Sequence, residues 1–518
     1  MSTASLAAVP IFRTSAPTKF PDVMRWLAVL AFLGSCALTP DPGLRLDPSP
    51  PGGSAIHIFR ARDGTQLAAI QWKATTPEVR GVVVLMHGLK DHTRNYVEVS
   101  QRLAASGYDV HAFDLRGHGR SAGPRAAPTS WDLYTDDLGL FLTWVQQRNP
   151  GRPVFLFGHS MGGAIATLAA LRHEPKLAGL VLSAPALAID APPMFLAMTQ
   201  LLGLMVPRAR VLDLANRDFS SDPLVSRSMD SDPLISQGPG PARTAIGLVD
   251  GMRMIWEHID RLTLPVLALH GTHDSLTAPA GSRALVNAAR STDKTLRIYQ
   301  GLHHNLLHEP GGKQVEDDIV AWLDARTGGP AVPPAPMYAG TLRGEPLGWT
   351  QAVELGAGVS QGIGFAGTTS LQLARPRPVG WHGGFTSQLV GDYKAVALRP
   401  VGVALRGGGA VLGVSAGGGF ITGGYFALSY GAWGELPLGP VHLGFLAERL
   451  RRVTNTDDHG PLASDQLWTS VSIRVGNDRY YWPNARAGVG PVFSGGRVWR
   501  GDDPSWFATI GVQLYGAD

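Results

Sequence analysis

The feature that most constrains this chain is a short apolar run followed at once by a glycine-serine-glycine turn. Residues 154–163 read Val-Phe-Leu-Phe-Gly-His-Ser-Met-Gly-Gly, and small residues compatible with a helix continue to Leu168. The pattern predicts a buried strand, a tight turn and a helix, because Gly158 and Gly162 leave room for a strained turn that projects the Ser160 hydroxyl from the end of a sheet. The following helix would direct backbone N–H groups at negative charge formed there. The alternative is an ordinary glycine-rich turn.

Strands and helices are expected to alternate on both sides of this turn. A hairpin at 56–72, with Asp63-Gly64 at its turn, precedes the first buried strand. Strands are expected at 82–86, 108–113, 180–183, 264–269 and 295–299, and helices at 95–105, 130–147, 281–290 and 312–325. This spacing predicts an α/β fold with a mostly parallel sheet covered on both faces.

The alternation stops at about 188–262, where no convincing strand is found. This stretch opens with a very apolar run at 193–206. We therefore expect a helical cap inserted between strands. The run either packs as core or lines a channel for an acyl chain and touches membrane.

The length of 518 residues predicts more than one folded part, and the composition changes near Gly328-Gly329-Pro330. The expected order is a signal segment at 1–36, a proline-rich tether at 37–53, the α/β domain at 54–327, a linker at 328–340 and a β-rich domain at 341–518. Charged residues make up only 17% of the chain and the net charge is +4. Because no basic stripe is present, we expect no nucleic-acid partner.

The N-terminus has the features of a bacterial export signal. Arg25 precedes an apolar run at 26–33, which ends in the motif Leu-Gly-Ser-Cys at Cys36. Cys36 is the only cysteine, so lipidation after cleavage suits it better than a disulfide; the alternative is a chance cysteine in an ordinary signal peptide. Either Met1 or Met24 could be the true start. Since Ala37 is not the aspartate that retains lipoproteins in the inner membrane, an exported protein anchored in the outer membrane is expected.

The C-terminal part is rich in glycine and aromatic residues. Strands are expected at 424–433, 441–448, 466–475 and 507–515, with alternating faces in the first of them. Trp506 and Tyr515 are candidates for residues at a membrane interface. An outer-membrane barrel of about eight strands fits this length. A soluble β-domain for binding or packing fits equally well.

A serine nucleophile needs a base and a carboxylate that orients the base. Asp274 follows the expected strand at 264–269, and His304 follows the strand at 295–299. Side chains at these strand ends converge on one crevice, and the order Ser, Asp, His is the one used by G-x-S-x-G hydrolases. His303 is the alternative base, and His308 lies in the same loop.

The oxyanion of an acyl-transfer reaction needs two backbone donors. The N–H of Met161, directly after the serine, is one candidate. The other is the N–H of Leu89, in the loop after the strand at 82–86. None of the sixteen histidines forms a convincing metal set, and no metal or cofactor is expected.

Several segments, in order, resemble the monoacylglycerol lipase and lysophospholipase branch of the α/β-hydrolases, which is sometimes grouped with the serine aminopeptidases. They lie at 87–96, 114–121, 158–162, 182–187, 270–274 and 298–304. The resemblance implies that Ser160 is the nucleophile, His304 the base and Asp274 its orienter, with Leu89 and Met161 as oxyanion donors. It also implies that His92 and the loop 116–119 brace the site. The chain departs from the pattern at Gln300, where glutamate is usual, and at the extra His303.

The expected activity is therefore hydrolysis of carboxylic esters of single-chain lipids by a lipase of the monoacylglycerol lipase or lysophospholipase type. Its partners would be the lipid ester and a membrane, reached through the lipidated N-terminus, with the C-terminal domain as a second candidate for membrane attachment. An esterase or peptidase acting on other substrates is the alternative. A non-catalytic binding protein of the cell envelope is the third reading.

Overall fold

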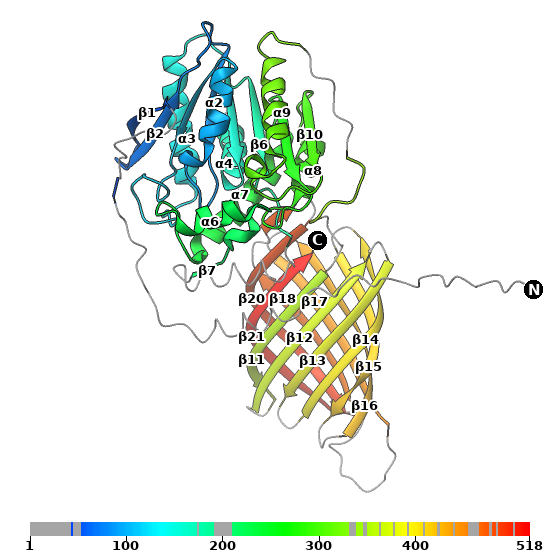
Figure 1. The fold of residues 1–518 in the computed structure, drawn as a ribbon. Helices are drawn as coiled ribbons and strands as arrows, with labels where there is room; N and C mark the ends of the chain where they lie inside the picture. The colour runs from blue at the N-terminus through cyan, green and yellow to red at the C-terminus, as the bar shows by residue number, and fades with distance from the viewer. Residues whose placement is uncertain are drawn as a thin grey trace, which may run out of the picture. The chain divides into compact units, whose positions relative to one another are not determined.

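In the computed structural model, the chain forms an α/β domain and a closed β-barrel (Figure 1). The structure describes residues 43–44, 53–173, 176–190, 210–330, 338–344 and 350–517, the last range with gaps between strands. Those gaps are 362–363, 377–378, 391–392, 408–409, 422–424, 439–440, 454–465, 476–478, 483–484 and 501–502. The signal segment with Cys36 and the apolar run 193–206 lie outside the described residues.

The α/β domain is built on an eight-stranded sheet in the order β1-β2-β4-β3-β5-β6-β9-β10. Its strands are β1 (Ala55–Arg60), β2 (Gln66–Trp72), β3 (Gly81–Met86), β4 (Tyr108–Phe113), β5 (Val154–His159), β6 (Gly179–Ser183), β9 (Val266–Gly271) and β10 (Lys294–Tyr299). β1 and β2 form the expected antiparallel hairpin, and the strands from β4 to β10 run parallel. The predicted α/β-hydrolase fold is confirmed.

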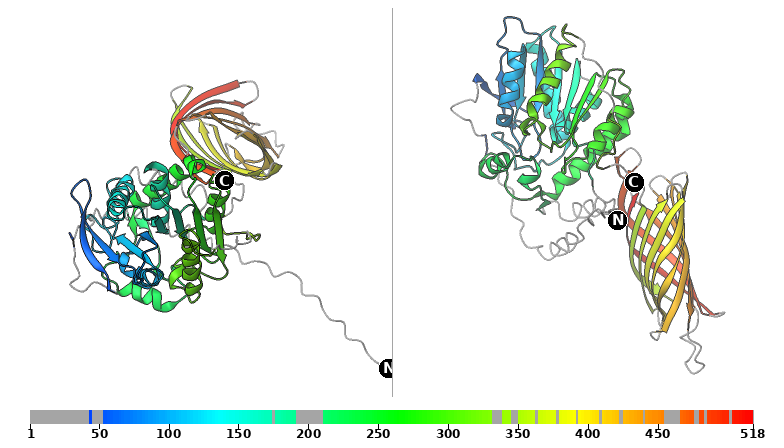
Figure 2. Two further views of the ribbon diagram at one scale, coloured as in Figure 1. Left: turned by 90° about the horizontal axis from the view of Figure 1, so that it is seen from above. Right: turned by 45° about the vertical axis from the view of Figure 1, so that its right-hand side comes forward.

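Helices cover both faces of this sheet (Figure 2). The helices α2 (Val97–Ala105) and α9 (Gly312–Asp324) pack on one face. The helices α3 (Asp132–Arg148), α4 (Met161–His173) and α8 (Pro279–Ala288) pack on the other. Because strand side chains alternate, β3 sends Val82, Val84 and Met86 to one core and Val83 and Leu85 to the other. A strand buried on both faces needs the continuous apolar sequence seen there.

Two helix starts differ slightly from expectation. The segment expected to begin α2 forms a separate 3-10 turn, η2 (Thr93–Tyr96). The Ser130 hydroxyl accepts a hydrogen bond from the Asp132 N–H at 3.3 Å, so it caps the chain just before α3 begins.

The insertion between β6 and β9 forms a cap. Its described elements are β7 (Arg210–Leu212), η3 (Asn216–Asp218), α6 (Pro223–Ser231), β8 (Gly240–Pro241), α7 (Ala242–His258) and η4 (Ile259–Arg261). The expectation of a cap without strands is wrong in one detail, because β7 and β8 pair with each other. A pairing this short carries no detectable period-two pattern. Within the described ranges, no helix is long and apolar enough to cross a bilayer.

The C-terminal part is an antiparallel barrel. Its strands are β11 (Thr350–Ser360), β12 (Gly364–Pro376), β13 (Val379–Val390), β14 (Tyr393–Gly407), β15 (Ala410–Ile421), β16 (Tyr425–Leu438), β17 (Val441–Arg452), β18 (Gln466–Val475), β20 (Ala485–Arg500) and β21 (Asp503–Ala517), with the short β19 (Arg479–Trp482) paired to β20. β11 pairs with β21, and β18 pairs with β20, which closes the ring. The expectation of about eight strands is wrong, since ten form the ring.

Candidate active site

Ser160 occupies the turn between β5 and α4 with a backbone φ of +53°. This left-handed conformation costs a non-glycine residue about 1–3 kcal/mol. A side chain at Gly158 would place its Cβ 2.6 Å from the Gly162 carbonyl oxygen, so only glycine fits there. The sequence therefore folds into the strained turn that the motif predicts.

Neighbouring backbone groups hold this turn in place. The Ser160 N–H donates to the Ser183 carbonyl at 3.0 Å, and the Ser160 carbonyl accepts from the Ala186 N–H at 2.9 Å. Two further non-glycine residues with positive φ lie near the ends of adjacent strands, namely Lys90 at +54° after β3 and Ala184 at +43° after β6. Strain is thus concentrated at the carboxyl ends of the central strands.

Asp274 and His304 meet at the same edge of the sheet. The His304 Nδ1 lies 2.8 Å from the Asp274 Oδ2, and both side chains are buried. The Asp274 Oδ1 accepts the N–H groups of Leu276 and Thr277 at 2.8 and 2.9 Å. These two backbone donors fix the rotation of the carboxylate, so that its other oxygen faces His304.

Asp274 is surrounded by groups that favour its charge. Burial alone would raise its pKa, but His304 and His270 outweigh burial, and the pKa of Asp274 lies well below the usual value. The His270 Nε2 lies 3.0 Å from the Asp274 Oδ2, and the Thr277 hydroxyl donates to the same oxygen at 2.8 Å. The carboxylate is therefore ionised throughout the neutral range, as an orienter of a base requires.

The rival histidines have other partners. The His303 Nδ1 lies 3.5 Å from Glu309, and the His308 Nε2 lies 2.8 Å from the Asn95 carbonyl oxygen. The His273 Nδ1 lies 3.1 Å from the Thr272 hydroxyl. Of the two candidate bases, His303 and His304, it is His304 that contacts Asp274.

His159 lies between the serine turn and the histidine loop. Its Nδ1 lies 3.2 Å from the Ser183 hydroxyl, and its Nε2 lies 3.2 Å from the Asn305 side-chain oxygen. Its ring centroid is 4.9 Å from that of His304. Burial, together with the neighbouring His304, lowers the pKa of His159 to about 3. His159 therefore stays neutral and adds no charge that would compete with protonation of His304.

The candidate oxyanion donors come from the two predicted places. Met161 is the first residue of α4, where backbone N–H groups have no intrahelical acceptor. Leu89 follows β3 and lines the same pocket as Ser160. A Cβ at Gly88 would lie 2.9 Å from the Ser160 Cβ, which shows how closely the two loops approach.

The loop that carries Leu89 is fixed internally by Asp91. This carboxylate accepts the Tyr96 hydroxyl at 2.6 Å, the Asn95 amide at 2.7 Å and the His92 N–H at 2.8 Å. Burial would raise the pKa of Asp91, but His87 and other nearby histidines outweigh it, and the pKa falls to about 2. The Asp91 carboxylate is therefore ionised at neutral pH and holds the loop through these three hydrogen bonds.

The same loop is tied to the cap by two side chains. The Lys90 ammonium donates to the Leu214 carbonyl at 2.8 Å and to the Asn216 side-chain oxygen at 2.7 Å. The His92 Nε2 lies 2.8 Å from the Asp232 carboxylate. His92 thus braces the site, as the resemblance implies, through a contact with the cap.

The histidine loop is also joined to the cap. The Asn305 N–H donates to the Phe219 carbonyl at 2.7 Å, and the Phe219 ring lies edge-on to His304 with centroids 5.7 Å apart. The Glu309 carboxylate accepts both the Ser220 and Ser221 hydroxyls at 2.6 and 2.8 Å. Cap residues from Leu214 to Ser221 therefore contact both loops that carry predicted site residues.

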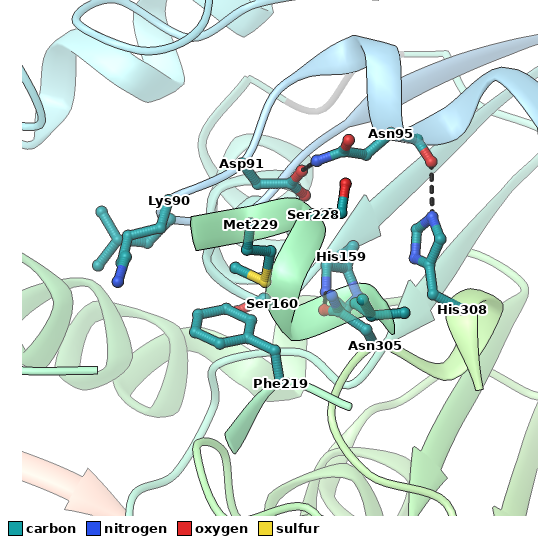
Figure 3. Close-up of a pocket in the computed structure, with 12 residues that line it drawn as sticks. Lys90, Asp91, Asn95, His159, Ser160, Phe219, Ser228, Met229, Asn305 and His308 are labelled. Carbon is teal, nitrogen blue, oxygen red and sulfur yellow. Dashed lines mark hydrogen bonds between the residues drawn. The ribbon is translucent and has the colours of Figure 1, made fainter. Parts of the chain in front are cut away.

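A pocket opens beside Ser160 (Figure 3). One part of its lining is apolar, from Leu89, Phe219, Val225 and Met229. The rest is polar, from Lys90, Asp91, Asn95, His159, Ser160, Ser228, Asn305 and His308. This mixture suits a substrate with an apolar chain and a polar end.

Sequence reasoning missed several of these residues. His270 and Thr277 hold Asp274, Lys90 reaches the cap, and Glu309 holds the cap to the histidine loop. The signal for His270 was its polar side chain at the end of a buried apolar strand, four residues before Asp274. The contacts of Lys90 and Glu309 depend on the path of the cap, for which the sequence has no periodic pattern.

The fold and the strained serine turn at the carboxyl edge of the sheet define an α/β-hydrolase. Residues 77–311 match the model of the family described as serine aminopeptidase, S33. The monoacylglycerol lipase of Mycolicibacterium smegmatis is 35% identical over 269 residues, which are 52% of this chain and 96% of that protein. Human monoglyceride lipase is 32% identical over 296 residues, which are 54% of this chain and 93% of that protein.

Among solved structures, the Paleococcus ferrophilus monoacylglycerol lipase is 31% identical with a TM-score of 0.46, covering 50% of this chain and 99% of that one. The chain belongs to this hydrolase family, on the branch that contains these lipases. It is a carboxylic ester hydrolase.

Proposed function

We propose that the protein hydrolyses carboxylic esters of single-chain lipids, such as monoacylglycerols or lysophospholipids, through Ser160, His304 and Asp274. The observation that carries this proposal is the buried contact between His304 and Asp274 at the same sheet edge as the strained Ser160 turn. The names of the relatives, monoacylglycerol lipases, support the substrate class.

The reaction would proceed in two steps. The Ser160 hydroxyl attacks the ester carbonyl while His304 takes its proton, and the alcohol leaves with that proton, which forms an acyl-enzyme. Water then attacks the acyl-enzyme by the reverse proton path and releases the fatty acid. Asp274 stabilises the transient imidazolium, and the N–H groups of Leu89 and Met161 stabilise the oxyanion.

The pocket supports a substrate with two ends of different chemistry. Phe219, Val225 and Met229 offer an apolar wall on the cap side of Ser160. Polar groups such as Asn95 and Ser228 line another part of the pocket and could bind a glycerol or other alcohol part. A single acyl chain with a small head group fits this division.

The polar part of the lining also supports a second candidate, an esterase for non-lipid substrates. Full-length protein in detergent micelles should be assayed on a short acyl ester, a monoacylglycerol and a lysophospholipid, with Ser160→Ala as the test variant and Ser106→Ala, at the C-terminal end of α2, as the matched control. We expect fatty acid release from at least one lipid, lost by about 10⁴-fold or more only in Ser160→Ala. Turnover of the short ester alone would favour the second candidate, and no turnover by folded protein would reject both.

We also propose that the protein is exported and anchored in the outer membrane through an acylated Cys36. The motif before Cys36 and the absence of any other cysteine in the sequence support this. Metabolic labelling with a fatty acid in a bacterial host should label the protein and not its Cys36→Ala variant. Equal labelling of both would reject the anchor.

A further inference from the structure

The outward face of the barrel is apolar on the strands around the ring. Alternate residues of each strand point outward, and in the middle of the strands most of these are aliphatic or aromatic. Exposed examples are Leu355, Val396, Leu398, Val403, Leu412, Val414, Leu428, Phe445, Val471, Ile473, Phe493, Ile510 and Val512. In β16, for instance, Phe426, Leu428 and Tyr430 are exposed, whereas Ala427 and Ser429 are buried.

The inward face carries charge and polarity. Arg399 and Glu448 form an ion pair in which both side chains are about 1% exposed. The Thr386 hydroxyl donates to Glu448 at 2.6 Å, and so does the Ser429 hydroxyl at 2.7 Å. Polar side chains line a pocket in the barrel, including Glu354, Thr368, Gln388, Ser470, Ser494 and Gln513. Water-soluble domains bury apolar groups and expose polar ones. The barrel has the opposite distribution, with polar side chains inside and apolar side chains outside.

Several charged and aromatic residues on the outward face lie near the strand ends. Arg375, Lys394 and Arg451 each stand next to the last or first residue of their strands. Near one rim, Phe365, Phe420, Phe426 and Trp506 are 47–60% exposed, and the strand register places them at the same end of the barrel. Aromatic girdles and flanking charges mark the two interfaces of a bilayer.

The strand lengths match the thickness of a hydrocarbon layer. The ring strands have from 10 residues in β18 to 16 in β20. At a rise of about 3.3 Å per residue and a tilt of about 45°, ten residues cover about 23 Å along the barrel axis. The apolar band of membrane barrels is about 25 Å tall.

We propose that this barrel spans a lipid bilayer, with acyl chains covering the apolar band. Lipid is the occupant that fits, because the band encircles a closed ring and a protein partner would have to surround it. The proposal is independent of which ester the hydrolase cleaves. It gives the chain a membrane attachment in addition to the one proposed at Cys36.

The test uses the full-length Cys36→Ala protein, so that no lipid anchor contributes. Urea-unfolded protein is diluted into phosphatidylcholine vesicles, and insertion is followed by flotation, by protease resistance of the barrel and by the mobility of unboiled samples in gels. Two single variants are compared. Leu355→Arg lies at the centre of β11, and Val379→Arg lies at the first residue of β13, and both positions are exposed.

We expect the parent protein to float with vesicles, and we expect its unboiled and boiled samples to migrate differently in gels. Leu355→Arg should lower the equilibrium constant for folding in vesicles by about 30-fold to almost 1,000-fold, and Val379→Arg by about fivefold at most. Equal effects of both substitutions would overturn the proposal. So would a barrel that stays monomeric in water without detergent, or that covers its band by forming stable oligomers there. None of these readouts depends on ester hydrolysis.

Discussion

Replacing Asp274 with asparagine should put a hydrogen-bond donor in the place of the carboxylate oxygen that faces His304. The Leu276 and Thr277 N–H groups donate to Oδ1, so the amide of the variant would keep its carbonyl oxygen there. Its NH₂ group would then take the place of Oδ2, 2.8 Å from the His304 Nδ1. An NH₂ donor in that place holds His304 in the tautomer with hydrogen on Nε2, which cannot accept a proton from Ser160.

The expected loss follows from removing the base while leaving the pocket unchanged. We expect kcat to fall by about 10⁴-fold, or about 5.5 kcal/mol, with KM changed less than threefold. Initial rates on a short acyl ester, with circular dichroism to verify folding, measure this. The matched control is Asp317→Asn on α9, which removes an exposed ion pair with Arg102 on α2. A folded Asp274→Asn enzyme with kcat within tenfold of the parent would refute the reasoning.

Three further changes test other parts of the site. Gly88→Ala would put a Cβ 2.9 Å from the Ser160 Cβ, so kcat should fall by about a hundredfold, whereas Gly240→Ala, with its nearest contact at 3.6 Å, should leave kcat unchanged. Because the folded pKa of Asp91 is about 2 against an ordinary 3.8, its charge contributes about 2 kcal/mol above pH 4, which is lost as the pH falls toward 2. The urea midpoint of Asp91→Asn should therefore lie below the parent at pH 7 and approach it at pH 2; a constant gap would contradict this. Lys90→Met removes both hydrogen bonds to the cap and should raise KM about tenfold with little change in kcat, and an unchanged KM would show that the cap is held by other contacts.

The α/β domain could be predicted because its signals are local. The buried strands β3, β5 and β9 are short continuous apolar runs, and each is followed by residues with a clear chemical role. The order of Ser160, Asp274 and His304 along the chain is enough to place them near one edge of a parallel sheet. The contacts between the cap and the loops that carry Leu89 and His304 could not be predicted, because they join residues more than eighty positions apart.

The number of barrel strands was underestimated because glycine weakens the strand pattern. Residues 417–419 of β15 are all glycine, which on propensity alone indicates a turn. In the barrel, glycine is required by neighbouring side chains. A Cβ at Gly413 would lie 2.6 Å from the His382 ring, and one at Gly444 would lie 2.4 Å from the Ser472 hydroxyl. These contacts exist only once the strands have paired, so the sequence alone does not show them.

The pairing of the first barrel strand with the last also sets an order of assembly. Residues Thr350 to Ser360 bond to Phe507 to Ala517, so every bond between β11 and β21 closes a loop of about 150 residues or more. Ribosomes make the chain from its N-terminus, so the complete hydrolase sheet is available long before the ring has its closing strand. Closure must therefore follow synthesis of nearly the whole chain, and it is the slow, non-local step. A chain cut short just before β21 would keep the whole hydrolase sequence and yet leave β11 and β20 as open edges, where other chains add and aggregate.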